Sequence, residues 1–224
     1  MALLGTGAVA IWHDIAEEGR DTFYAWHGRE HMPERVAIPG FNRGRRYVAL
    51  AARAEFFNLY EAENPEVLSG PDYLARLNHP TPWTVSTVRH FRDVARAVCR
   101  VLVSTGEGAG GLIATWRYAV AAESSTRHAE AVSGLLRELL ENPHVAAAHL
   151  LAADPDASSV ETAERRARGG RNAVPPWILL VEGWGDREPF EALCRDAATL
   201  ERLSASGVVG EPEFGLYRLQ AVAV

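Results

Sequence analysis

The chain has 224 residues, a formal net charge of −6, 47% hydrophobic residues and 23% charged residues. This composition is typical of one globular protein, and it excludes a disordered chain and a fibrous repeat. All 23 Lys-plus-Arg residues are arginines, which excludes Schiff-base chemistry through lysine and a P-loop lysine. The acidic balance argues against a nucleic-acid partner.

The N-terminal stretch up to Ile15 has no basic segment and contains His13 and Asp14, unlike a signal peptide. No run approaches ~18 uninterrupted apolar residues, which predicts that no segment spans a membrane. Cys99 and Cys194 lie in apolar patterns, which predicts two buried, reduced thiols. From these features we expect a cytoplasmic protein.

The first half of the chain alternates predicted strands and helices in a βαββαβ order. Short apolar, β-prone segments predict the strands, and helical spacing between Pro, Gly and Asn breakers predicts the helices. The strands are expected at residues 8–15, 41–50, 55–62 and 95–104, and the helices at residues 20–36, 65–77 and 84–90.

A Gly-rich segment at residues 106–111 divides the chain near its middle and is expected to be a flexible linker. The same element order then recurs, with strands expected at residues 112–120, 145–153, 177–184 and 214–224, and helices at residues 123–141 and 186–204. The polar, Arg-rich insertion at residues 154–176 is expected to be a mobile loop or a short solvated helix whose charges have no specific role.

Two βαββαβ units predict an α+β protein made of two fused ferredoxin-like repeats, residues 1–105 and 112–224. Each repeat would form an antiparallel sheet with helices on one face, and the bare faces must be buried. Residues 10–12 (Ala-Ile-Trp) and 114–116 (Ala-Thr-Trp) match in position, which favours a tandem duplication. We therefore expect a pseudo-dimeric α/β barrel within one chain, as a monomer or a further homodimer.

Residues 30–35 read Glu-His-Met-Pro-Glu-Arg, and residues 38–41 read Ile-Pro-Gly-Phe before Arg-Arg-Tyr at 45–47. With Phe-Asn-Leu-Tyr-Glu at 57–61 and Tyr-Leu-Ala-Arg-Leu-Asn at 73–78, this pattern resembles uncharacterised bacterial members of the dimeric α/β barrel superfamily. The resemblance implies a ligand cavity between sheet and helices. It does not imply one reaction, because the superfamily includes muconolactone isomerases, cofactor-free polyketide monooxygenases and cyclases, ether-degradation accessory proteins and, more distantly, haem enzymes.

Four residues of the first half are candidates for catalysis: His31, His79, Tyr60 and Asn78. Histidine titrates near neutrality and is the commonest proton shuttle, so His31 is the leading base or acid, with His79 as its partner if both reach the cavity. Asn78 or Tyr60 would polarise an oxygen of the substrate. The alternative is that His31 caps helix carbonyls and His79 is fixed in a Pro-rich turn.

Five residues are candidates for ligand binding. Trp12, Trp26 and Trp83 would suit a flat apolar ligand, although packing in the core is the alternative. Arg45 and Arg46 would hold a carboxylate, because guanidinium groups bind it with two parallel hydrogen bonds. Since neighbouring strand residues point to opposite faces, at most one of this pair enters the barrel.

Residues 27–31 (His-Gly-Arg-Glu-His) also match the inverted zinc-protease motif. Gly28 weakens a helix between the two histidines, and no third ligand motif follows, so we do not predict a peptidase. A plain metal site at His27 and His31 is a weak alternative. No cofactor motif is present, and no cofactor is expected.

These features predict a small-molecule-binding enzyme with cofactor-independent proton-transfer chemistry of the isomerase, lyase or cyclase type, acting on an apolar metabolite with or without a carboxylate. The alternatives are a cofactor-free monooxygenase, a non-catalytic ligand-binding or accessory protein, and a metal- or haem-dependent enzyme. A site in the first half is favoured, because the second half has a Leu-rich helix where the first has His31.

Overall fold

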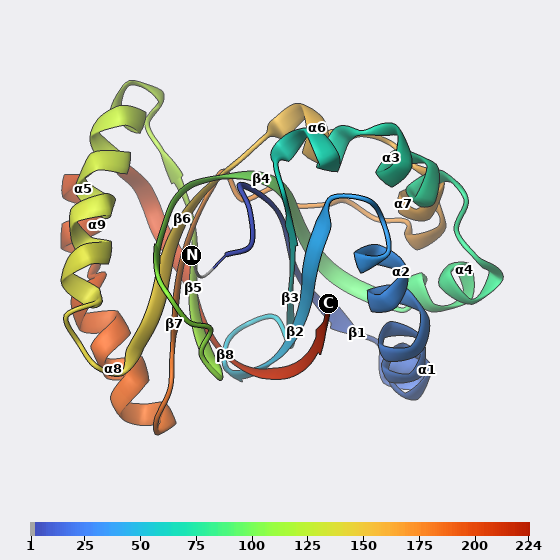
Figure 1. The fold of residues 1–224 in the computed structure, drawn as a ribbon, viewed down its shortest axis with the longest axis horizontal. Coiled ribbons are helices and arrows are strands. Elements are labelled where there is room, and N and C mark those ends of the chain that lie inside the picture. Colours follow the sequence, from blue (N-terminus) through green and yellow to red (C-terminus); the bar gives the residue numbers. More distant parts are fainter. Residues whose placement is uncertain (1–2) are drawn as a thin grey trace.

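A computed structural model describes residues 3–224 and shows a closed barrel of antiparallel strands (Figure 1). The strands are β1 (Gly7–Ile15), β2 (Phe41–Ala51), β3 (Phe56–Ala62), β4 (Phe91–Gly106), β5 (Leu112–Val120), β6 (Val145–Ala153), β7 (Trp177–Gly183) and β8 (Val208–Ala223). Their order around the barrel is β1-β3-β2-β8-β5-β7-β6-β4. The protein is therefore an α+β, pseudo-dimeric barrel of two fused ferredoxin-like units, as the sequence predicts.

Each half contributes four adjacent strands, in the order β4-β1-β3-β2 and β8-β5-β7-β6. The two seams are the β2–β8 and β4–β6 pairs. The long strands β4 and β8 form these seams, because each pairs with its own half along one end and with the other half along the opposite end. In the closed barrel every strand has a neighbouring strand on each side.

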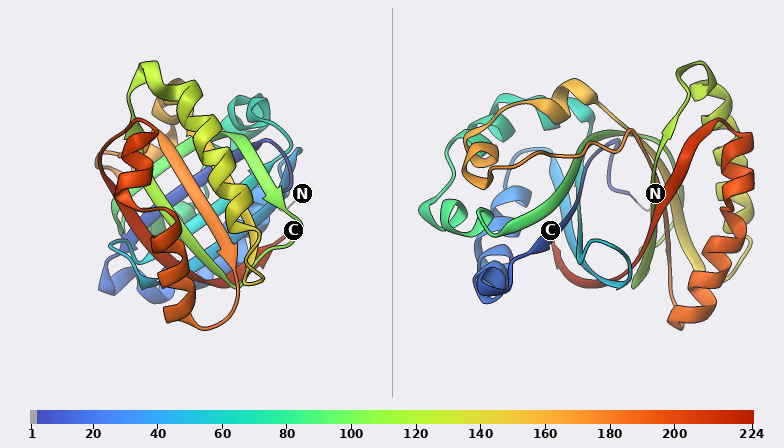
Figure 2. Two further views of the ribbon diagram at one scale, coloured as in Figure 1. Left: turned by 90° about the vertical axis from the view of Figure 1, so that its left-hand side faces the viewer. Right: turned by 180° about the vertical axis from the view of Figure 1, so that it is seen from behind.

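Helices cover the outer faces of the barrel, and the two halves carry separate groups on opposite sides (Figures 1 and 2). The first half carries α1 (Arg20–Trp26), the π-helical segment η2 (His27–His31), α2 (Met32–Val36), η3 (Pro65–Ser69), α3 (Pro71–Asn78) and α4 (Pro82–Val88), after the short η1 (Glu17–Gly19). The second half carries η4 (Ala122–Ser124), α5 (Ser125–Leu139), α8 (Arg187–Ala197) and α9 (Leu200–Ala205). No helix among residues 3–224 is long and apolar enough to cross a membrane.

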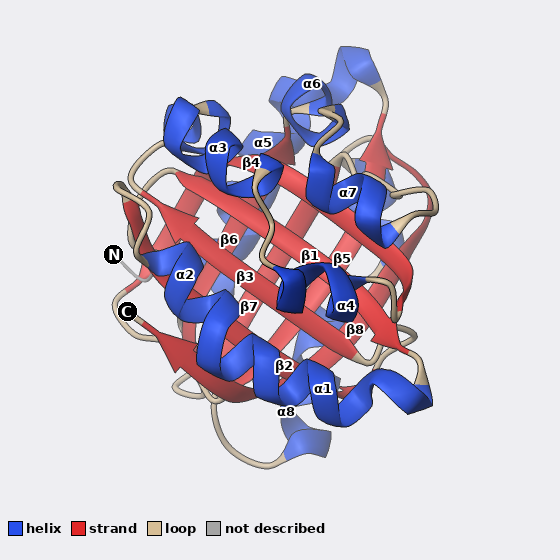
Figure 3. Cartoon of the chain, turned by 90° about the vertical axis from the view of Figure 1, so that its right-hand side faces the viewer, coloured by secondary structure: helices blue, strands red, loops and turns tan. Residues whose placement is uncertain are grey.

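The insertion at residues 154–176 leaves the second half and lies over the helical face of the first (Figures 1 and 3). It folds into α6 (Pro155–Ser159) and α7 (Ala163–Arg168), and α7 packs against α3 and α4. The backbone of Ala173 pairs with β4 through Arg96 N–H and Val94 C=O. The segment contains short helices, one of the two expected forms, but its charges are not all solvated: Glu164 and Arg168 line a pocket against the first half, whereas Arg166 is exposed.

The Gly-rich segment at residues 106–111, expected to be a flexible linker, joins β4 to β5 and packs closely at Gly106 and Gly110, whereas residues 107–109 are exposed. Gly106 has a φ of +96°, which favours glycine. A Cβ on Gly110 would lie 2.1 Å from the carbonyl oxygen of Gly183. The Gly110 N–H also donates to the Glu182 carboxylate at 3.3 Å. These glycines allow the β4–β5 connection to approach the backbone of β7.

Strand alternation divides the core between the barrel interior and the two helix-covered faces. The interior contains large buried side chains such as Trp12, Tyr47, Phe57 and Leu180. On the second half, a continuous apolar cluster that includes Leu135, Leu136, Leu139 and Phe190 fills the space between sheet and helices. On the first half, the corresponding space holds polar side chains and a cavity.

Candidate functional site

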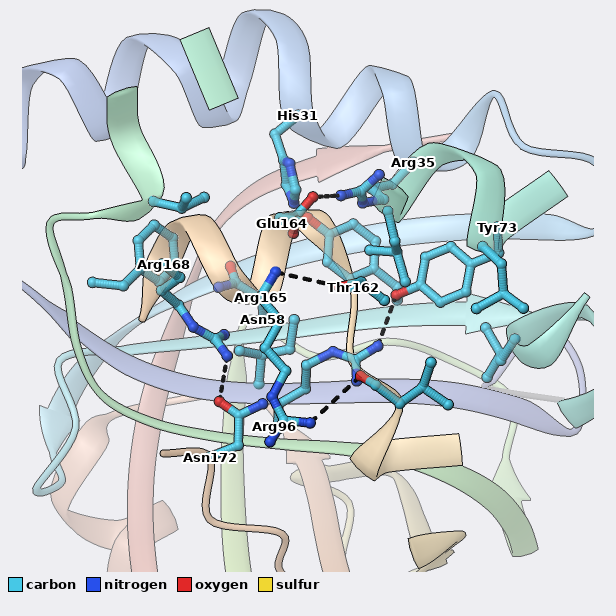
Figure 4. Close-up of a pocket in the computed structure, with 18 of the residues that line it drawn as sticks. His31, Arg35, Asn58, Tyr73, Arg96, Thr162, Glu164, Arg165, Arg168 and Asn172 are labelled. Carbon is cyan, nitrogen blue, oxygen red and sulfur yellow. Dashed lines mark hydrogen bonds and ion pairs between the residues drawn. The ribbon is translucent and has the colours of Figure 1, made fainter. Parts of the chain in front are cut away.

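A cavity of about 200 Å³ lies between the first-half sheet, the helical rod from α1 to α2, and the insertion. Figure 4 shows side chains from all three parts pointing into it. The lining residues used below are Ile11, Trp26, His27, His31, Arg35, Asn58, Tyr60, Tyr73, Phe91, Arg96, Glu164, Arg165, Arg168 and Asn172. Because a cavity of ~150 Å³ binds benzene, this one has room for a single substituted aromatic ring.

His31 enters the cavity from η2, a single π-helical turn within the rod, and such turns often occur at functional sites. Its ring centroid lies 4.2 Å from that of Trp26 and 6.2 Å from that of Tyr60. Nδ1 of His31 is buried and makes no hydrogen bond within residues 3–224. Burial, reinforced by the positive charge of Arg35, lowers the pKa of His31 well below 6.5, so the imidazole is neutral near pH 7.

His27 lies one turn earlier, and both of its ring nitrogens have partners. Arg46 Nη1 donates to Nδ1 at 3.3 Å, because a guanidinium has no acceptor. Nε2 therefore carries the proton and donates to the hydroxyl of Tyr60 at 3.4 Å. Burial, with the charge of Arg46, lowers the pKa of His27 well below 6.5. His27 orients Tyr60 and offers no free lone pair to a metal.

Asn58 projects from β3 into the cavity, two residues before Tyr60 on the same face. Its Nδ2 group lies 2.9 Å from Nε2 of His13, which is completely buried behind it. Oδ1 of Asn58 is also buried and makes no hydrogen bond among the described residues. Two residues that line the cavity therefore have a buried polar atom without a partner among the described residues: Nδ1 of His31 and Oδ1 of Asn58.

The cavity is electropositive although the chain is acidic, because four arginines and one acidic residue line it. Arg35 forms an ion pair with that residue, Glu164. Arg165 lies 3.3 Å from Glu161 at the rim. Arg96 donates to the Tyr73 hydroxyl at 3.0 Å, which is uncharged, so positive charge is left uncompensated at the cavity.

Three of the nine predicted site residues, His31, Tyr60 and Trp26, line this cavity. The Nε1 group of Trp26 donates to Thr84 Oγ1 at 3.1 Å, which fixes the indole against α4. Trp83 is half-buried on α4, where it packs beside the cluster around Trp26 but does not line the cavity.

Arg45 and Arg46 point to opposite faces of β2, as strand alternation requires, but neither lines the cavity. Arg45 lies inside the barrel, where its guanidinium binds the Glu182 carboxylate at 2.6 and 2.9 Å. Arg46 donates to Gln220 Oε1 at 2.7 Å, in addition to its contact with His27. Trp12 also lies inside the barrel, with its ring stacked on Phe57 at 4.7 Å.

The structure does not bring His79 to His31, so the predicted acid–base pair is not formed. His79 is exposed at the end of α3, and its Nδ1–H donates to the carbonyl of Ala75 at 2.8 Å. Asn78 is exposed as well, and its Oδ1 accepts the backbone N–H of Ala163 at 3.1 Å. These two residues cap α3 and fasten the insertion, roles that local sequence around Pro80 does not reveal.

The zinc-protease pattern has a structural explanation. The carboxylate of Glu30 accepts the hydroxyls of Thr81 at 2.6 Å and Thr84 at 3.3 Å, which ties η2 to the start of α4. Within residues 3–224, no three His, Cys, Asp or Glu side chains gather as a metal site. A haem macrocycle does not fit a cavity of about 200 Å³, and both nitrogens of His27 are engaged.

Sequence reasoning missed Asn58, Arg96 and Arg168 as lining residues. Asn58 and Arg96 could have been found from the sequence, because each is a polar residue in a predicted strand. Strand alternation also places Asn58 on the same face as Tyr60. Arg168 had none, because only the tertiary path of the insertion brings it to the first half.

No protein-family model matches the chain, and no curated protein matches it. Among solved structures, the chain is similar to an anthrone oxidase-like protein, with 14% identity and a TM-score of 0.63 over 97% of this chain and 92% of that chain. It is also similar to a candidate monooxygenase from Lactobacillus acidophilus, with 10% identity and a TM-score of 0.57 over 97% of this chain and 96% of that chain. A haem-binding protein from Thermus thermophilus is similar as well, with 11% identity and a TM-score of 0.53 over 97% of this chain and 92% of that chain. The chain has the dimeric α/β-barrel fold. At these identities the likeness extends to the fold alone.

Proposed function

We propose that the protein is an enzyme that binds a small aromatic molecule in the first-half cavity and oxidises it with O2, without a cofactor, using His31 as the base. One observation carries the proposal: the neutral imidazole of His31 lines a cavity with aromatic walls, and its Nδ1 makes no hydrogen bond among the described residues. A general base needs a neutral ring nitrogen within reach of the substrate.

The chemistry begins when His31 removes a proton from an acidic C–H or O–H group of the substrate. Arg96 and Arg168 line the same cavity and would stabilise the resulting anion. The electron-rich anion then reacts with O2. For a CH2 group bonded to the aromatic ring, the net change is CH2 + O2 → C=O + H2O: two C–H bonds break, one oxygen atom stays in the product and the other leaves as water.

The isomerase, lyase or cyclase function expected from the sequence shares the first proton transfer. We place oxidation ahead of it because two of the similar structures carry names of the monooxygenase or anthrone oxidase type, and none of the three names an isomerase. Dependence on O2 separates the two functions, because a proton-transfer reaction proceeds equally well without oxygen.

The test uses single-ring hydroxyarenes as probes, with an oxygen electrode and mass spectrometry after ¹⁸O2 labelling. We expect O2 uptake by protein whose metal content is measured as negligible. His31→Gln should lower turnover ~10²-fold or more, as loss of a general base does. His79→Gln is the matched control, because His79 is exposed outside the cavity. Equal turnover in both variants, or activity proportional to bound iron, would contradict the proposal.

A further inference from the structure

We propose that the ligand of this cavity is a hydroxylated aromatic carboxylate, and that Arg168 of the insertion, together with Arg96 of β4, binds its carboxylate. The inference rests on the proposed function in one respect only, the use of the same cavity. It deepens that function by naming the class of molecule that the cavity accepts.

The first step is the pairing of the two guanidinium groups. Arg96 donates to the hydroxyl of Tyr73, and Arg168 donates through Nη2 to the amide oxygen of Asn172. Both partners are uncharged, and neither arginine forms an ion pair within residues 3–224. Arg35, which also lines the cavity, is by contrast paired with Glu164. Arg96 and Arg168 are therefore the cations that remain for a ligand.

The second step concerns Arg168 itself. Nε of Arg168 is buried and makes no hydrogen bond among the described residues. Burial, and to a smaller extent repulsion from Arg96, lowers the pKa of Arg168 to about 10. A carboxylate at this place would offset both effects, since it supplies the missing acceptor and the opposite charge. Asn172 meanwhile holds the guanidinium in place, as Figure 4 shows.

The third step concerns Asn58, whose unpartnered atom is a hydrogen-bond acceptor, whereas the arginines supply donors. The backbone carbonyl of Asp14 can only accept a hydrogen bond, so Nδ1 of His13 carries the proton and Nε2 has a free lone pair. The NH2 group of Asn58 is held to that lone pair, and Oδ1 makes no hydrogen bond among the described residues. An unpartnered buried oxygen accepts from a hydroxyl or an N–H group. The cavity thus offers donors from Arg168 and an acceptor from Asn58, with aromatic walls between them.

The experiment is isothermal titration calorimetry with 2-, 3- and 4-hydroxybenzoate and the three corresponding hydroxybenzamides, which are similar in size and neutral. We expect at least one hydroxybenzoate to bind roughly tenfold or more tightly than its amide. Arg168→Gln should remove that difference, by a tenfold or larger loss of affinity for the acid and less than a threefold change for the amide. Arg168→Lys, which keeps the charge but not the planar fork, should be intermediate.

Arg166→Gln is the matched control, because Arg166 lies on the same helix α7, is exposed and does not line the cavity. It removes the same charge and should leave both affinities unchanged. Equal binding of acids and amides overturns the carboxylate site, and so does an equal loss in Arg166→Gln and Arg168→Gln. Absence of binding by every acid also overturns it. None of these outcomes decides the proposed oxidation, which the His31→Gln oxygen assay tests with uncharged probes.

Discussion

The guanidinium of Arg35 on α2 forms an ion pair with the carboxylate of Glu164 on α7, across 129 positions of the sequence. This pair joins the helical rod of the first half to the insertion that leaves the second half. Asn78 adds a second tie, through the N–H of Ala163 at the start of α7. α7 has no buried residue of its own, and Ala167 is only partly buried against the cluster around Trp26. Polar contacts therefore carry much of the attachment of the insertion over the cavity, and such a segment opens locally at low cost.

Glu164→Gln should loosen the insertion, because it leaves the buried guanidinium of Arg35 with the more distant carboxylate of Glu34, at 4.0 Å, as its charged partner. We expect faster amide hydrogen exchange across residues 155–168 and a loss of about 1–3 kcal/mol in the free energy of unfolding. Ligand dissociation should also accelerate. Glu161→Gln is the control, because Glu161 belongs to the same segment but is exposed. Unchanged exchange in Glu164→Gln would show that this ion pair does not hold the insertion.

A second buried ion pair, Arg45 with Glu182, lies inside the barrel, where both side chains are at most 1% exposed. Glu182 also contacts Nε2 of His149 at 3.3 Å. Glu182→Gln should destabilise the protein by about 1–3 kcal/mol, since it breaks the buried hydrogen bonds of Arg45 to Glu182 and leaves Glu61, 2.9 Å from Nε, as the remaining carboxylate partner of Arg45. The double variant Arg45→Met/Glu182→Leu should recover most of that loss, which urea denaturation would measure. Ligand affinity should stay unchanged in the double variant, and a tenfold loss would place Arg45 at the binding site after all.

The sequence predicts the barrel because its signals are local and repeated. Alternation along Ala10 and Trp12 marks the interior face of β1, and the Leu-rich stripe around Leu136 marks the face that α5 buries. Part of the site follows from the same logic, since His31 and Trp26 lie on the inner face of a predicted helix.

The helices expected at residues 65–77 and 186–204 are each broken in two, at Gly70 and at Ala198–Thr199.

The rest depends on contacts between distant segments. His79 lies in the predicted motif region, but the end of α3 turns it to solvent, and a Pro-rich segment does not specify that direction. Arg168 reaches the cavity only because residues 154–176 cross to the other half of the molecule. The Arg-rich composition of that segment looks solvated when taken alone, and only its position over an electropositive cavity gives the charges a role.

The stability of the protein should fall in mild acid. Burial lowers the pKa of His13 to about 3 and that of His128 to about 4, and it lowers the pKa values of His27 and His31 well below 6.5. The unfolded chain takes up these protons as the pH falls through 6.5, while the folded protein does not. The stability is therefore full above pH 6.5 and is lost between pH 6.5 and about 4, by at most ~1.4 kcal/mol per pH unit for each histidine.

Urea denaturation at pH 7.5, 6.5 and 5.5 measures this loss directly. His128 lies in the second half, where Tyr118 and Ser206 bind its two ring nitrogens at 3.0 and 2.8 Å. His128→Gln should therefore reduce the slope of stability against pH without changing ligand affinity. A free energy of unfolding that stays constant within ~1 kcal/mol from pH 7.5 to 5.5 would mean that the folded protein accepts these protons.

The contact between His13 and Asn58 gives the sharpest test of how the cavity is built. His13→Leu removes the acceptor of the Asn58 NH2 group and should cost about 1–3 kcal/mol, because a buried donor is left without a partner. Asn58→Leu should cost a similar amount for the converse reason. If the two act as one unit, the double variant should lose less stability than the sum of the single variants, since removal of both partners leaves no unsatisfied group.

His13→Leu should also weaken binding of a hydroxybenzoate but not of benzoate, which has no hydroxyl for Oδ1 of Asn58. Additive losses and an equal effect on both acids would show that His13 only fills space behind the cavity.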